Sequence, residues 1–99
     1  MGAIKSNNYQ NEELLISRLG RAISHPARVK ILHKLRDENA GCRSVDLAKW
    51  LNFTKPTMKE HIDMMKDAGI LTVEYLPHFY SISLNDSGKQ FADKIFNEN

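Results

Sequence analysis

The sequence predicts an α+β domain that is mainly helical, with the element order ααααββα. Apolar residues recur at helical spacing from about residue 10 to residue 68, in segments that Ser, Pro, Gly and Asn separate. After Gly69 the period changes, because β-branched and aromatic residues dominate 70–75 and 79–84. The residues between these two segments, 76–78, have the length of a hairpin loop, so we expect an antiparallel pair of strands.

Length and composition favour a single domain over residues 1–99, in which the polar residues 1–9 are expected to form a flexible arm. No apolar run approaches the roughly 18 residues that cross a bilayer, and the first residues lack the apolar region of a secretory signal. We therefore expect a cytoplasmic protein without a membrane partner. Cys42 is the only cysteine and is expected to be a free thiol, and its use as a redox switch stays open.

The first two helices are expected over about residues 10–24 and from Pro26 onward. Ser24 or His25 can cap the second helix, with Pro26 in its first turn, where a missing backbone N–H costs nothing. Between residues 14 and 36 the chain holds six basic residues and no acidic one. Such a block favours a polyanionic partner, although a solvated helix face explains it equally well.

Start signals also mark a short third helix and a longer fourth helix. Ser44 is expected to cap 45–52, and Thr54 is expected to cap 55–68, which stops at Gly69. One stripe of the fourth helix is expected to face inward and to leave a polar outer face. The residues of this stripe are Met58, Ile62 and Met65.

The third helix, a turn at residues 52–53 and the fourth helix make a helix-turn-helix, and the hairpin after it makes a wing. This arrangement suits double-stranded DNA, because a helix roughly 10 to 12 Å across fits the major groove and a hairpin tip reaches the neighbouring backbone. The candidate DNA-binding residues lie near the start of the third helix, in the first turns of the fourth helix and in the hairpin loop. They are Arg43, Ser44, Thr54, Lys55, Thr57, Lys59, Glu60 and His78.

Other interpretations of the fourth helix stay open. Its charges are balanced, with three lysines against Glu60, Asp63 and Asp67, which also fits a solvated face or a module that binds another protein. We expect no enzyme, because no nucleophile, base and orienting group form a recognisable set. His61 lies next to the inward stripe and is expected to be a half-buried, hydrogen-bonded histidine rather than a metal ligand.

Three segments allow a comparison with a known family: AISHPARVKILHKL in the second helix, SVDLAKWLNFTKPTMKEHIDMMKDAGIL across the helix-turn-helix, and HFYSISL in the second strand. Through them the chain resembles the ArsR-type winged-helix repressors from about residue 19 to residue 84. The junction SLNDSGKQF is instead similar to that of MarR-type winged helices. The resemblance implies a winged helix-turn-helix transcription regulator that reads DNA with the first half of the fourth helix and dimerises through the first and last helices. We expect a repressor, and the sequence leaves activation open as the alternative.

Metal sensing through the known sites of this family is not expected. Metal-sensing members carry a paired-cysteine box in the third helix, whereas Cys42 stands alone here. Other members use Asp and His along the last helix, which here holds Asp86 and Asp93 but no histidine. Since a single cysteine cannot close a tetrahedral zinc site, the sequence implies no metal and no cofactor, and it leaves the effector and the operator unknown.

The first helix and a last helix over residues 86–96, capped by Asn85, have more apolar surface than peripheral helices usually need. We expect this surface to be the seam of a homodimer. The alternative is that both helices pack within one chain. The residues of the expected seam are Leu15, Leu19, Phe91, Ile95 and Phe96.

Overall fold

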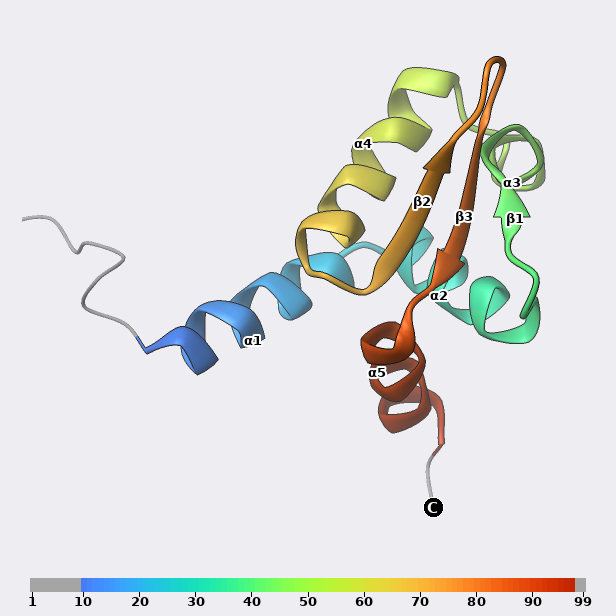
Figure 1. Cartoon of the computed structure of the whole chain (residues 1–99). Coiled ribbons are helices and arrows are strands. Elements are labelled where there is room, and N and C mark those ends of the chain that lie inside the picture. The colour runs from blue at the N-terminus through green and yellow to red at the C-terminus, as the bar shows by residue number, and fades with distance from the viewer. Residues whose placement is uncertain (1–9, 98–99) are drawn as a thin grey trace, which may run out of the picture.

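The computed structural model describes residues 10–97 as helices around a small sheet (Figure 1). In chain order the elements are α1 (Asn11–Ala22), α2 (Pro26–Asp37), β1 (Cys42–Arg43), α3 (Ser44–Leu51), α4 (Lys55–Asp67), β2 (Leu71–Tyr75), β3 (Tyr80–Leu84) and α5 (Asp86–Phe96). The mainly helical α+β fold is confirmed, with one strand added before α3. The arm expected at residues 1–9 lies outside the described residues. Within residues 10–97, no helix is long and apolar enough to cross a membrane.

The added strand, β1, pairs antiparallel with β3, which also pairs antiparallel with β2. β1 has two residues, and Cys42 lies opposite Ile82. Gly41 precedes this strand with a φ of 88°, and a Cβ atom on it would stand 2.8 Å from the carbonyl oxygen of Ile82. Glycine is therefore required where β1 approaches β3. So short a strand has no periodicity of its own, which is why the sequence did not predict it.

Side-chain caps begin three of the helices at the residues that the sequence predicted. His25 caps α2, Thr54 caps α4 and Asn85 caps α5, each by accepting a hydrogen bond from a backbone N–H two or three residues later. Such a bond satisfies one of the N–H groups that the first turn of a helix leaves without a partner. These caps fix where α2, α4 and α5 begin.

The predicted cap of α3 is wrong. Arg43 is the N-cap residue and makes no side-chain cap, whereas Ser44 is the first helical residue. The hydroxyl oxygen of Ser44 accepts a hydrogen bond from the backbone N–H of Tyr80 at 3.1 Å, and Ser44 is buried. Ser44 therefore binds α3 to the start of β3 instead of closing its own helix.

The core lies between the helices and one face of the sheet. The inward stripe of α4 is confirmed, because Met58, Ile62 and Met65 are at most 2% exposed. Opposite this stripe lie buried side chains of α2, α3 and β3, among them Leu32, Leu47 and Ile82. Burial of a side chain of this size contributes roughly 1.5–3 kcal/mol, so the packing fixes which face of α4 points outward.

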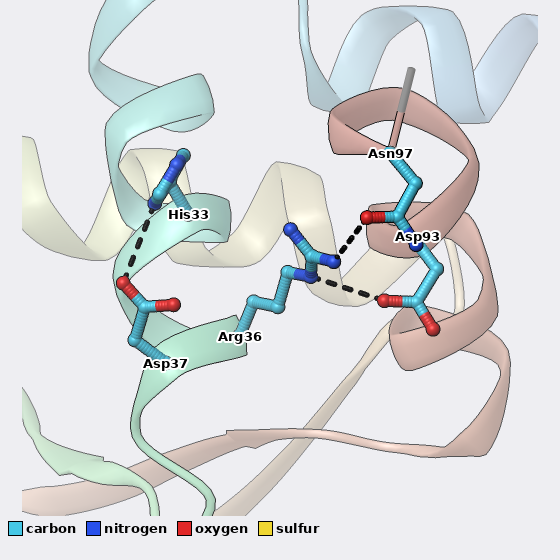
Figure 2. A network of polar contacts seen from close by, with 5 residues as sticks. All are labelled: His33, Arg36, Asp37, Asp93 and Asn97. Carbon is cyan, nitrogen blue, oxygen red and sulfur yellow. Dashed lines mark hydrogen bonds and ion pairs between the residues drawn. The ribbon is translucent and has the colours of Figure 1, made fainter. Parts of the chain in front are cut away.

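Polar and aromatic contacts tie the C-terminal halves of α2 and α5 together (Figure 2). Arg36 of α2 donates two hydrogen bonds. Its Nε donates to the Asp93 carboxylate at 3.0 Å, and its Nη2 donates to the side-chain oxygen of Asn97 at 2.8 Å. Beside this pair, the ring centroids of His33 and Phe96 lie 4.5 Å apart. These contacts fix the direction of α5 on α2.

Gly88, in the first turn of α5, lies against the backbone that joins α4 to β2. A Cβ atom at Gly88 would stand 2.1 Å from the carbonyl oxygen of Ile70. The Asn85 side chain closes the same junction, because it accepts from Gly88 N–H at 2.7 Å and donates to the Gly69 carbonyl at 2.9 Å. Glycine is therefore required at residue 88 for space.

We expect Gly88→Ala to lower the free energy of unfolding by about 2 kcal/mol or more, because the new methyl group collides with a backbone atom and α5 must shift. Urea denaturation followed by circular dichroism measures this loss. The control is Ser87→Ala at the exposed neighbouring position, which we expect to change stability by less than about 0.5 kcal/mol. Equal losses in the two variants would contradict the steric explanation.

Candidate nucleic-acid interface

The outer face of α4 is open to solvent over its N-terminal half. Lys55, Lys59 and Glu60 are exposed, and Thr57 is partly buried. The Thr54 hydroxyl organises the first turn, because it accepts from Thr57 N–H at 3.3 Å and donates to the Thr57 hydroxyl oxygen at 3.0 Å. The positive end of the helix dipole lies at this turn and favours an anion there. This half of α4 therefore presents cations and hydrogen-bonding groups to solvent, next to a helix end that favours anions.

An ion pair balances part of the charge on this face. Lys59 Nζ lies 2.8 Å from Asp63 Oδ2, and the two side chains are 66% and 49% exposed. Hydrogen bonding to the Asp63 carboxylate raises the pKa of Lys59, which stays protonated. Because solvent and salt screen an exposed pair, a phosphate can replace Asp63 as the partner of Lys59.

The hairpin loop, residues 76–79, lies at the same end of the molecule as the first turn of α4 (Figure 1). The Leu76 N–H closes this loop by donating to the Phe79 carbonyl at 2.9 Å, and His78 is exposed within it. Arg43, exposed at the start of α3, lies beside the loop with its guanidinium 5.4 Å from the centre of the Phe79 ring. Arg43 also pairs with Asp46 at 2.9 Å.

Most of the candidate DNA-binding residues thus gather on solvent-facing parts of α4, the hairpin loop and the start of α3. Those that are exposed or partly buried are Arg43, Thr54, Lys55, Thr57, Lys59, Glu60 and His78. Ser44 is the exception, because it is 6% exposed and its hydroxyl is used by Tyr80. We therefore do not retain Ser44 as a contact.

A groove that no sequence pattern indicated lies between α3, the N-terminal half of α4 and the hairpin, and we call it the hairpin groove. Its volume is about 480 Å³. Tyr75, Leu76 and Phe79 of the hairpin line it, and Lys55 and Lys59 line it from α4. The alternation of apolar residues indicated the strands, but no local signal shows that three separate elements enclose a space.

His61 lies beneath the outer face of α4, where α4 meets α2. It is 5% exposed, so it is buried more deeply than the half-buried position that we expected. The expected hydrogen bond is confirmed, because His61 Nδ1 accepts from Arg28 Nε at 3.0 Å. Arg28 is also buried, and it donates to the Arg21 carbonyl and to the Ser24 hydroxyl. One guanidinium therefore joins α4 to α2 and to the end of α1.

Burial lowers the pKa of His61, and the positive charges of Arg28 and His25 lower it further. A histidine whose pKa is lowered by folding binds its proton more tightly in the unfolded chain, so protonation favours unfolding. Its contribution to stability is present above the unfolded pKa of about 6.5 and is lost as the pH falls through the lower folded pKa.

We expect the free energy of unfolding to fall between about pH 7.5 and about pH 5.5, and His61→Gln to reduce that fall. The glutamine oxygen can accept the Arg28 hydrogen bond without titrating. Urea denaturation at each pH measures how steeply the free energy of unfolding falls with pH. The control is His78→Gln in the exposed loop, which we expect to show the same pH dependence as the wild-type protein. If the free energy of unfolding of His61→Gln fell as steeply with pH as that of the wild-type protein, a group other than His61 would be responsible for the pH dependence.

The residues of the expected dimer seam differ in exposure. Leu15 is 49% exposed, and Leu19, Phe91, Ile95 and Phe96 are partly buried and pack against the core. The structure adds Ile16, which is 59% exposed on the same helix and which the sequence analysis did not select. Figure 1 shows α1 extending away from the other elements, so much of its apolar surface faces solvent in one chain.

Comparison with known proteins agrees with this geometry. Residues 25–73 match the model of "Bacterial regulatory protein, arsR family". The chain is 36% identical over 67 residues to the transcriptional repressor SdpR of Bacillus subtilis. The aligned segment covers 66% of this chain and 70% of SdpR. The segment that the family model matches includes the whole helix-turn-helix and ends within β2.

Solved structures show the same fold. The homodimeric winged helix-turn-helix DNA-binding domain Mb0332 of Mycobacterium bovis has a TM-score of 0.73 at 13% identity, covering 96% of this chain and 86% of that one. The cadmium metal-sensor CMTR of Mycobacterium tuberculosis has a TM-score of 0.59 at 30% identity, covering 78% of this chain and 75% of that one.

The family match, together with the fold, defines the class of protein: the DNA-binding winged helix-turn-helix regulators of transcription, which are not a family of enzymes. The chain belongs to the arsR family of bacterial regulatory proteins.

Proposed function

We propose that this protein is a repressor that binds operator DNA in the cytoplasm as a homodimer, with one α4 in each of two successive major grooves. The observation that supports this most is the open N-terminal half of α4, where Lys55 and Lys59 are exposed beside the hairpin loop. Two copies related by a twofold axis would read half-sites about one helical turn, roughly 34 Å, apart. The operator is then approximately palindromic.

Each contact residue has a role that follows from its chemistry. Lys55, Lys59 and the Thr54 hydroxyl suit phosphates, which contribute affinity but no sequence information. Thr57 and Glu60 suit base edges, because a threonine methyl fits the thymine methyl and a glutamate accepts from the amino group of cytosine. We assign contacts with the DNA backbone to Arg43, which is exposed beside the hairpin loop, and to His78, which is exposed within it.

The homodimer would use the apolar surface of α1 together with α5. Leu15 and Ile16 leave about half or more of their side-chain surface in water in one chain, which a second copy would cover. Mb0332, whose fold is shared, is homodimeric, which supports assembly of this chain as a dimer.

We further propose that the protein does not sense metals through the known sites of its family. Cys42 is the only cysteine in the sequence, and burial raises the pKa of its thiol, which disfavours the thiolate that binds soft metals. In this respect the chain would differ from the cadmium sensor CMTR.

We expect the addition of zinc or cadmium to leave the affinity of this protein for DNA unchanged, as measured by a gel-shift titration.

The main test replaces Lys59 by glutamate. We expect Lys59→Glu to weaken operator binding by about tenfold to a hundredfold, because a phosphate contact is lost and a repulsive charge is gained. Gel-shift titration with DNA selected from the genome by the purified protein measures the change. Lys89→Glu, which makes the same charge change on the exposed surface of α5, serves as the control.

Salt provides a second readout of the same contacts. Affinity of the wild-type protein should fall steeply as salt rises, and the slope should be smaller for Lys59→Glu than for Lys89→Glu. The proposal would be contradicted if the affinity for DNA did not change with salt concentration, or if the purified protein selected no DNA from the genome.

The dimer is tested by Ile16→Asp and Leu15→Asp, which place a charge in the expected seam. Both positions are exposed in one chain, so we expect the fold to persist, the dimer to dissociate and the DNA affinity to drop. Sedimentation measures the mass, and circular dichroism checks the fold. Wild-type protein that sediments as a monomer at every concentration would refute the twofold arrangement.

A further inference from the structure

The hairpin groove has the size and lining of a site for a small molecule. Its volume of about 480 Å³ lies within the roughly 300–1,000 Å³ of typical ligand pockets. Tyr75 and Leu76 on its wall are 65% and 39% exposed, although both are large apolar side chains. Exposed apolar side chains that line one hollow are typical of a surface that a ligand covers.

The chemistry of the walls defines what would fit. The hairpin contributes three aromatic rings, of which Tyr75 and Tyr80 lie 5.9 Å apart in a tilted arrangement. Ala48 of α3 is small and leaves room opposite them. Lys55 and Lys59 supply positive charge from the α4 side. The complement of this surface is a flat apolar molecule with one negative charge.

We propose that the hairpin groove binds a small aromatic carboxylate, with its ring against the hairpin aromatics and its carboxylate at Lys55 and Lys59. This inference rests on the proposed function in one respect: the ligand would occupy the lysines that contact phosphate. Ligand and DNA would therefore exclude one another, and the ligand would release the operator. Asp63, the present partner of Lys59, would have to give up that ion pair to the ligand.

The first test titrates the full chain, labelled with ¹⁵N, with 2-naphthoate and separately with the uncharged 2-naphthylmethanol. We expect saturable amide shifts at residues 55–59 and 75–80, and about fivefold tighter binding of the carboxylate, as expected for exposed charge pairs. Shifts confined to other residues, or equal affinities for the two compounds, would overturn the proposal.

Variants of the walls give the second test. Leu76→Glu places a carboxylate in the groove at an exposed position and should abolish naphthoate binding while the fold persists. Lys59→Gln should weaken binding about fivefold, whereas Lys89→Gln, with the same change of charge on α5, should leave it unchanged. Naphthoate binding to Leu76→Glu at wild-type affinity would rule out this site. Loss of the dimer in Leu76→Glu would assign the groove to a second copy of the chain and would also overturn the proposal.

A competition experiment separates this inference from the proposed function. Saturating naphthoate should lower the DNA affinity of the wild-type protein but not that of Leu76→Glu. If the chain binds naphthoate at the groove but binds no genomic DNA, the repressor proposal fails and the ligand site stands. If the chain binds DNA with the same affinity in saturating naphthoate, the repressor proposal stands and mutual exclusion is refuted.

Discussion

The burial of one face of α4 is the constraint on which the other features of the molecule depend. Met58, Ile62 and Met65 lie in the core, and successive residues of a helix turn by about 100°. Once this stripe is fixed, the directions of Lys55 and Lys59 are fixed as well. A rotation of α4 by one residue would expose methionine and bury lysine, which the core does not tolerate. The stability of the fold and the exposure of Lys55 and Lys59 therefore depend on the same packing.

The parts of this fold that the sequence could predict are those with local causes. Thr54 and Asn85 cap their helices through backbone groups within three residues, so the sequence contains the whole signal. Ser44 is also of a residue type that caps helices, but it is the first residue of α3, and its hydroxyl accepts from the backbone N–H of Tyr80 in β3, which is distant in sequence. The two-residue β1 and the hairpin groove form where separate elements come together. The residue pattern within one element does not predict such contacts between elements.

The buried side chain of Arg28 in α2 connects α4 with the end of α1. The guanidinium is always charged, is 9% exposed and has neutral hydrogen-bond partners in His61, the Arg21 carbonyl and the Ser24 hydroxyl. Loss of the His61 side chain would leave the buried Nε–H of Arg28 without its acceptor, which is costly. The end of α1 and the underside of α4 are thus held in one arrangement by one side chain.

The clamp that Arg36 forms with Asp93 and Asn97 has a mechanical consequence (Figure 2). α5 lies at the end of the molecule opposite the hairpin loop (Figure 1), and the two hydrogen bonds of Arg36 attach it to α2. In a homodimer of the kind proposed above, the direction of α5 on α2 would therefore set how far apart the two hairpin loops lie along a duplex.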